Sequence, residues 1–459
     1  MNRTRISIMA LAGLFVCSFA SLTMAQPGDV TATASDDIEL VVETAEMDAA
    51  AQTSGSLFHR YTEFWTRASR KANRIGVTRQ VPKGFVSVGA EIKSYTITRR
   101  YDKVRKEGPA FPLNVTAITG GNHLNVDMGL NAELMQRNFQ IAYGITDLLS
   151  VNIEIPTMYM DVAMNPSVAT IDGQDNKVSG PSASILDIQD RKNYGAADFI
   201  YNTLPLLGRP SPATNYTGDW LLGDVSAGVS WNAYRSECKS YPCLSVSFFP
   251  RVWFPTASMP DSNHSLAYGM GPMMDPGLGG WSVGSTQGLD VRLYRIERWL
   301  DLVASVQVAA RYGFEQERDY PTMLTTVAGP AADWRRFPDL SELDGKFRYT
   351  PGWQLHWSAQ LNAATSILAV GASYNVQFNQ DPEIMAPYEF VTVLRNIEQL
   401  GQSLFEYAQI SAALDFSEFY VPLEVGFQYN IVLDGYNAMK YDDYFTIMAR
   451  LNIPLFSDI

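Results

Sequence analysis

The sequence predicts an all-β fold, a transmembrane antiparallel up-and-down β-barrel of about twelve strands that follows an N-terminal, partly helical extension. Three observations predict it: an export signal, long stretches in which apolar and polar side chains alternate, and connections that alternate between short and long. A barrel strand shows one face to lipid and the other to the lumen, so this alternation is its sequence signature.

The first 25 residues predict a cleaved secretory signal peptide. Met1–Arg5 form a short basic segment, Ile6–Ala20 form an apolar run, and Thr23–Ala25 supply a cleavage site. A membrane-spanning helix is the weaker interpretation, because about 20 apolar residues are needed to cross a bilayer and this run is shorter. We therefore expect the chain to be exported.

Composition argues against a helical membrane protein and against nucleic acid as a partner. After the signal, no stretch is long and apolar enough for a transmembrane helix, and the mean hydropathy is -0.09, yet the chain carries 23 Tyr, 22 Phe and 9 Trp. Barrel strands give no hydropathy peak, because polar residues separate their apolar ones. The formal net charge of -13 leaves no basic patch to neutralise phosphates.

Residues 26–83 predict a leader between the signal and the barrel. Residues 26–54 are rich in Ala, Thr, Asp and Glu, which indicates a flexible acidic segment. Leu57–Ala72 predicts a short helix, because Leu57, Tyr61 and Phe64 recur at helical spacing. This leader could plug the barrel, extend into the periplasm, or be a loosely attached amphipathic segment.

Residues 84–459 are assigned to the barrel, because the period changes to two from Phe85 onward. In Leu149–Ile155 the apolar residues take one face, while Ser150, Asn152 and Glu154 take the other. The same rhythm recurs in Asp224–Tyr234, Leu302–Tyr312, Trp353–Ala363, Leu368–Phe378, Val421–Ile431 and Phe445–Ile453. A soluble β-sandwich also alternates, but its strands average about 5–6 residues, whereas membrane strands need about 9–11.

The connections between these segments alternate in length. The short ones lie at Thr146–Asp147, Ser236–Tyr241, Ile296–Arg298, Ser366 and Phe416–Glu418, and the long ones at Met164–Thr217, Thr256–Gly279, Glu315–Pro351 and Gln380–Gly401. Short periplasmic turns and long extracellular loops are typical of barrels in the outer membrane of Gram-negative bacteria. This gives twelve strands, or fourteen if Asn122–Asn131 adds to the barrel.

The cysteines predict one local disulfide. Cys17 leaves with the signal, so Cys238 and Cys243 remain, closely spaced in an exported protein. A zinc site is the alternative, but two thiols without nearby His do not make four ligands. No metal is therefore expected, and no cofactor.

Three motifs resemble an outer-membrane family named for the meta-pathway of phenol degradation, whose members are described as transporter-like. They are Tyr143–Val151 (YGITDLLSV), similar to the family's glycine, turn and strand hairpin, Leu222–Gly228 (LGDVSAG), similar to its Gly-Asp strand start, and Phe254–Thr256 (FPT). The resemblance implies a membrane-embedded barrel that passes small organic or aromatic compounds. It supplies no catalytic residues, and the leader, the Cys238/Cys243 turn and the long loops depart from the family.

If the apolar face meets lipid, the opposite face lines the lumen. The alternation then predicts these lumen-lining charged or titratable residues: Glu91, Lys93, Glu154, Asp224, Arg251, Asp290, Arg292, Arg311, His356, Glu424 and Arg450. They have two interpretations. They pair with one another, since burial without a partner is costly, or they line an aqueous path and set its selectivity.

We expect no enzyme. The four His residues show no metal-ligand spacing, and His356 with Ser358 is the one candidate for a hydrolase on a strand face. The acidic loops follow no calcium-site spacing.

The sequence thus predicts an outer-membrane channel or transporter for small organic compounds, aromatic or hydrophobic ones among them, with lipid and solute as its partners. A non-transporting envelope or adhesion barrel that acts through its long surface loops is the alternative, and the oligomeric state is left open.

Overall fold

The fold is described from a computed structural model. The described residues are 75–110, 112–116, 123–127, 130–164, 167–171, 215–218, 220–236, 241–258, 276–296, 299–319, 345–388, 391, 401–419 and 421–454. The signal peptide, the helix expected at Leu57–Ala72 and Cys238 lie outside them.

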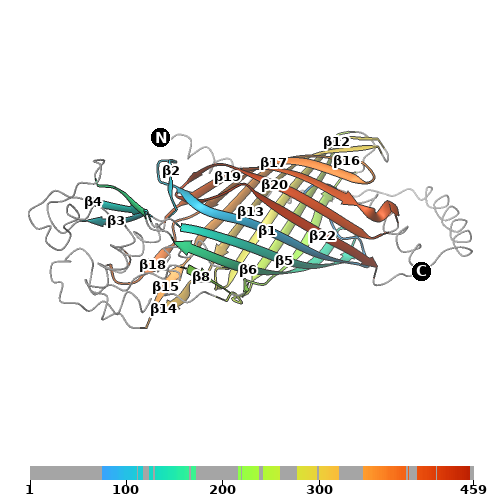
Figure 1. The fold of residues 1–459 in the computed structure, drawn as a ribbon. Helices are drawn as coiled ribbons and strands as arrows, with labels where there is room; N and C mark the ends of the chain where they lie inside the picture. The colour runs from blue at the N-terminus through green and yellow to red at the C-terminus, as the bar shows by residue number, and fades with distance from the viewer. Residues whose placement is uncertain are drawn as a thin grey trace, which may run out of the picture. The chain divides into compact units, whose positions relative to one another are not determined.

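Twelve strands form one closed antiparallel barrel (Figure 1). They are β1 (Phe85–Tyr101), β5 (Leu130–Thr146), β6 (Leu149–Met164), β10 (Ser226–Arg235), β11 (Cys243–Trp253), β12 (Ser282–Ile296), β13 (Leu300–Gly313), β16 (Gly352–Ala364), β17 (Leu368–Asn379), β19 (Ser403–Asp415), β20 (Leu423–Tyr436) and β22 (Tyr444–Pro454). Each pairs with the next, and β22 pairs with β1 to close the ring. The predicted barrel of about twelve strands is confirmed.

The long connections carry additional strands outside this ring. One three-stranded sheet joins β3 (Pro112–Thr116), β4 (His123–Asp127) and β7 (Ser167–Ile171), and another joins β14 (Gln316–Asp319), β15 (Lys346–Thr350) and β18 (Glu383–Met385). Four short strands pair beside β1 or β6. The partners of β1 are β2 (Glu107–Pro109) and β21 (Ala438–Tyr441), and those of β6 are β8 (Asn215–Thr217) and β9 (Leu221–Leu222). Because β4 pairs with β3 and β7 outside the ring, it adds no strand to the barrel, and the alternative of fourteen is wrong.

The two faces of the barrel wall differ as the alternation predicts. On β6, Ile153 is 48% exposed, while Ser150 is 3% exposed. The same contrast is found on β1 and β12, where Val88 and Val283 are exposed and Ser87 and Ser282 are buried. The apolar side chains therefore lie on the outer face, and small polar side chains fill the inner one.

The chain enters the barrel before it forms the first strand. Ile75 packs against Val303 of β13 and Ala364 of β16. Thr78 bonds to Asp290 of β12. Since these and further contacts on β6, β10 and β20 surround Ile75–Gln80, this stretch, called the lumen segment below, lies inside the ring at the end where the short turns are found.

Candidate functional site

One buried carboxylate holds the lumen segment to the wall. Asp290 is 1% exposed, and it accepts hydrogen bonds from the backbone N of Val77 (3.0 Å) and of Thr78 (2.9 Å) and from Thr78 Oγ1 (2.5 Å). Gly76 has a φ of 104° and passes so close that a Cβ would lie 2.4 Å from Asp290 Oδ2. Only glycine fits there without displacing the carboxylate.

Two further contacts attach the segment to other strands. Gln80 Oε1 accepts hydrogen bonds from Ser150 Oγ of β6 (3.0 Å) and Ser230 Oγ of β10 (2.7 Å). Arg79 donates from both terminal nitrogens to Glu424 of β20, at 3.1 and 2.7 Å. Burial acts to lower the pKa of Arg79, but the Glu424 carboxylate raises it, so the guanidinium stays charged.

The structure brings most of the charges expected in the lumen together as pairs. Lys93 contacts Glu91 at 2.8 Å on β1, and Arg251 of β11 pairs with Glu154 of β6. Arg292 of β12 pairs with Asp301 of β13 at 2.9 Å. Pairing of this kind reduces the cost of burying the charges.

Asp224 of the loop before β10 anchors a second inward segment, at the end with the long connections. Its carboxylate accepts hydrogen bonds from the backbone N of Leu278 (2.6 Å) and of Gly279 (3.3 Å). Arg311 Nη2 of β13 donates to it at 3.1 Å, and the Arg311 guanidinium lies 4.5 Å from the ring centroid of Trp253. Pro276–Gly280, called the strap below, is thereby tied to the barrel wall.

The motifs that carry the family resemblance meet beside this anchor and beside the lumen segment. Thr256 Oγ1 accepts a hydrogen bond from the backbone N of Val225 and donates to the carbonyl of Gly223. A Cβ on Gly144 would lie 1.9 Å from the carbonyl oxygen of Pro82, so glycine lets the incoming chain pass the β5–β6 hairpin. These residues position backbone rather than ligand.

Two titratable residues from the expected set have other surroundings. Arg450 of β22 stands opposite Glu424 in the strand register. His356 lies on β16 with its Nε2 buried and without a hydrogen-bond partner among the described residues. Ser358 Oγ accepts a hydrogen bond from Gln360 Nε2 (3.0 Å), and among the described residues none joins it to His356, so the geometry supplies no activated serine.

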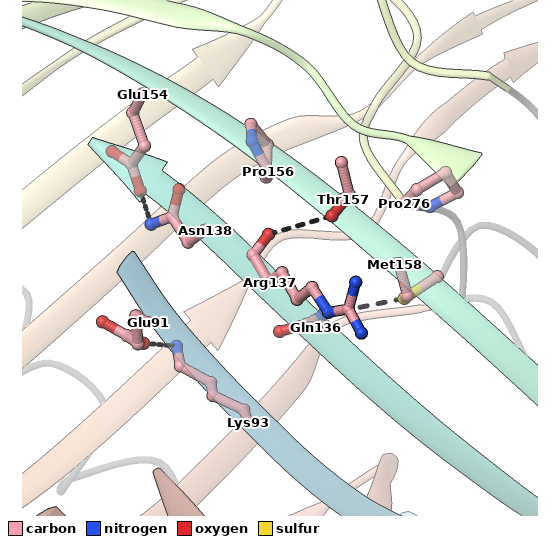
Figure 2. Close-up of a pocket in the computed structure, with 10 residues that line it drawn as sticks. All are labelled: Glu91, Lys93, Gln136, Arg137, Asn138, Glu154, Pro156, Thr157, Met158 and Pro276. Carbon is pink, nitrogen blue, oxygen red and sulfur yellow. Dashed lines mark hydrogen bonds and ion pairs between the residues drawn. The ribbon is translucent and has the colours of Figure 1, made fainter. Parts of the chain in front are cut away.

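A polar pocket of about 180 Å³ opens beside the Glu91–Lys93 pair (Figure 2). Figure 2 shows Lys93 directed toward Glu91 and Asn138 toward Glu154. The strap reaches this pocket through Pro276. The residues lining it come mostly from β1, β5 and β6: Glu91, Lys93, Gln136, Arg137, Asn138, Glu154, Pro156, Thr157, Met158 and Pro276.

A group of aromatic side chains that the sequence analysis did not single out lies next to this pair. Tyr95 follows Lys93 by two residues on the same face of β1, and its ring centroid is 4.8 Å from Tyr441 and 5.5 Å from Tyr444. Phe405 lies 5.1 Å from Tyr441 and 5.6 Å from Tyr407. We call these five residues the aromatic cluster. Tyr95 could have been found from the alternation, whereas β19 and β21 were not singled out.

Cys243 is disulfide-bonded, and the pairing with Cys238 stays a prediction, because Cys238 lies outside the described residues. Within the described part of the chain, no group of three or more His, Cys, Asp or Glu residues could hold a metal ion. No helix among those residues is long and apolar enough to cross a membrane.

No family model matches the chain, and no curated protein matches it either, so the phenol-degradation resemblance stays a prediction. Solved structures similar to the chain include the COG4313 outer membrane channel from Pseudomonas putida F1, with 9% identity over 83% of this chain and 99% of that one and a TM-score of 0.47.

The translocator domain of the autotransporter NalP from Neisseria meningitidis has 8% identity over 92% of this chain and 99% of that one, with a TM-score of 0.30. A FadL homologue from Pseudomonas aeruginosa has 10% identity over 81% and 90%, with a TM-score of 0.23. At these scores the likenesses carry no argument about function, and the fold rests on the strand pairing of the chain itself.

Proposed function

We propose that the chain is an outer-membrane channel for small organic solutes. The observation that carries the proposal is the closed twelve-stranded barrel whose outer face is apolar and whose inner face is polar. An apolar outer face suits hydrocarbon, while a closed ring leaves no strand edge unpaired in lipid. A polar interior suits a path for solutes.

The lumen segment makes this channel a gated one. Eight-stranded barrels are filled by side chains, and wide pores appear at about 16–18 strands, so twelve strands enclose a narrow path. Ile75–Gln80 occupies part of that path at one end of the barrel. The strap, which is hydrogen-bonded to Asp224, reaches the pocket from the other end. A solute can therefore pass only if the lumen segment moves or leaves room beside it.

Planar-bilayer recording and liposome swelling test the proposal. The full chain should give discrete ion-conducting steps, and a variant that lacks residues 75–80 should give larger ones. Heat-modified migration on a gel checks that both barrels fold. If both proteins fold and both are sealed in both assays, the channel proposal fails.

A non-transporting envelope or adhesion barrel is the second candidate. It is favoured by the sheet of β3, β4 and β7, which the long connections form outside the ring and which offers a folded surface to a partner. Deleting residues 165–216 removes β7 and separates the two functions. An adhesion barrel would lose its binding to cells or matrix, while a channel would keep its conductance or gain some.

A further inference from the structure

We propose that the pocket beside β1, β5 and β6 binds a small organic carboxylate, with Lys93 and Gln136 as hydrogen-bond donors and the apolar side chains of Pro156, Met158 and Pro276 packing against its carbon skeleton. This inference rests on the proposed channel function and specifies which solutes it favours. It follows from which polar groups in the pocket are already satisfied within the protein and which are not.

Lys93 supplies a cation that a solute can reach. An ammonium group has three donor hydrogens, and among the described residues the ion pair of Lys93 is the one with Glu91 at 2.8 Å. The Lys93 side chain remains 37% exposed. It can therefore keep its contact with Glu91 and still donate to a bound anion.

Gln136 adds a second donor on the neighbouring strand β5. Its Nε2 donates to the sulfur of Met158 at 3.7 Å, which is a weak bond because a thioether is a poor acceptor. A carboxylate oxygen would be a stronger acceptor for the same N–H group. Gln136 and Lys93 thus present their donors from adjacent strands, as the register places Lys93 opposite Gln136.

The carboxylate of Glu154 does not oppose an anion in this pocket. One of its oxygens accepts from Asn138 Nδ2 and the other from Arg251 Nη1. Because Arg251 neutralises it, the cations that line the pocket are Lys93, which pairs with Glu91, and Arg137, whose guanidinium lies 3.7 Å from the ring centroid of Trp220. A cationic solute would meet both Lys93 and Arg137 and would have to break an existing ion pair to reach a carboxylate.

Apolar groups in the lining define the rest of the ligand. Pro156, Met158 and Pro276 line the pocket together with the polar residues. A solute ring can pack against the proline rings and the methionine thioether. A cavity of about 150 Å³ can hold a benzene molecule, so the 180 Å³ found here accommodates a ring that carries one carboxylate. A hydrocarbon without polar groups would leave the donors unpaired, which is unfavourable.

Benzoate, benzyl alcohol and benzylamine, three molecules of similar size and different charge, test this inference. Their binding to the full-length protein in detergent is measured by calorimetry, and their block of conductance is measured in bilayers. Benzoate should bind at least about tenfold more tightly than the other two. Acetate should bind more weakly than benzoate, because it has no ring to pack against Pro156, Met158 and Pro276.

Variants of Lys93 then assign the effect to the pocket. Lys93→Met should weaken benzoate binding about tenfold or more and leave benzyl alcohol binding unchanged, and Lys93→Arg should restore most of it. The matched control is Lys106→Met, in an exposed loop, which should change neither ligand. To remove the effect of an unpaired Glu91, the double variant Glu91→Gln with Lys93→Met should behave like Lys93→Met alone.

Equal affinity for benzoate and benzyl alcohol would overturn the inference, as would an equal loss of both in Lys93→Met. The two proposals fail separately. If benzoate binds as described but no current passes, the channel function fails and the carboxylate site stands. If current passes with no preference for benzoate, the channel stands and the carboxylate site fails.

Discussion

Replacing Asp290 should open the channel by releasing the lumen segment. The carboxylate accepts three hydrogen bonds, from the backbone N of Val77 and of Thr78 and from Thr78 Oγ1. A hydrogen bond to a charged group contributes about 1.5–3 kcal/mol. Contributions within one network are not additive, so we expect Asp290→Ala to weaken attachment of the segment by about 3 kcal/mol in total.

This loss shifts the equilibrium between the docked and released segment by about two orders of magnitude, because 1.4 kcal/mol corresponds to a factor of ten. The attachments at Gln80 and at Arg79 remain, so the segment is expected to open often rather than to stay out. Two measurements check this. Single-channel recording should show a higher open fraction, and the backbone amides of Val77 and Thr78 should exchange with deuterium faster.

The matched control is Asp442→Asn, an exposed carboxyl group in the turn before β22. It should change neither conductance nor exchange. Gel migration checks that the Asp290→Ala barrel is folded. If the folded variant shows the conductance and the amide exchange of the wild type, Asp290 does not hold the segment and the account of gating is wrong.

Three further predictions address the barrel wall, the Arg79–Glu424 ion pair and the turn at Asp102. Ile153→Lys places a charge on the outer face of β6 and should lower the free energy of unfolding in lipid by about 2 kcal/mol. Urea titration in vesicles measures this loss, and an unchanged midpoint would contradict the assignment of that face to lipid. Arg79→Met should destabilise the barrel more than the double variant with Glu424→Gln, because the single change takes a cation away from the Glu424 carboxylate while the double change also removes the negative charge. An equal loss in both variants would contradict this. The backbone N–H of Lys106 donates to the Asp102 carboxylate and lowers its pKa. The bond therefore stabilises the turn above the ordinary pKa of an aspartate and is lost as the pH falls through the lowered value. The protection of the Lys106 amide against deuterium exchange, relative to its intrinsic rate at each pH, should fall only on acidification, and Asp102→Asn should remove that dependence.

The barrel could be predicted from the sequence because its signal is local. In Leu149–Ile155 the parity of each position separates the outward residues from the inward ones, and the structure shows the same division between Ile153 and Ser150. The short turns are also visible locally in the sequence, and counting the segments between them gives the number of strands. A strand was anticipated within Asn122–Asn131, and β4 lies there, but its place outside the ring could not be predicted because it depends on pairing with β3 and β7.

The lumen segment could not be predicted in this way. The spacing of apolar residues predicts a helix at Leu57–Ala72. The contacts inside the barrel are instead made by Ile75–Gln80, whose apolar residues follow neither a helical nor a strand period. Thr78 meets Asp290 across 212 positions of sequence, and nothing near either residue indicates the other. The same holds for the aromatic cluster, which depends on how β1, β19, β21 and β22 come together.

The lumen segment is tethered to the strand that closes the barrel. It precedes β1 by a few residues, and β1 is also the strand that meets β22, from Phe85 opposite Pro454 to Ser94 opposite Phe445. The seam therefore joins the first and last strands of the barrel. Because this short tether holds Ile75–Gln80 near the ring, a released segment keeps a high effective concentration at its binding site and can return to it readily.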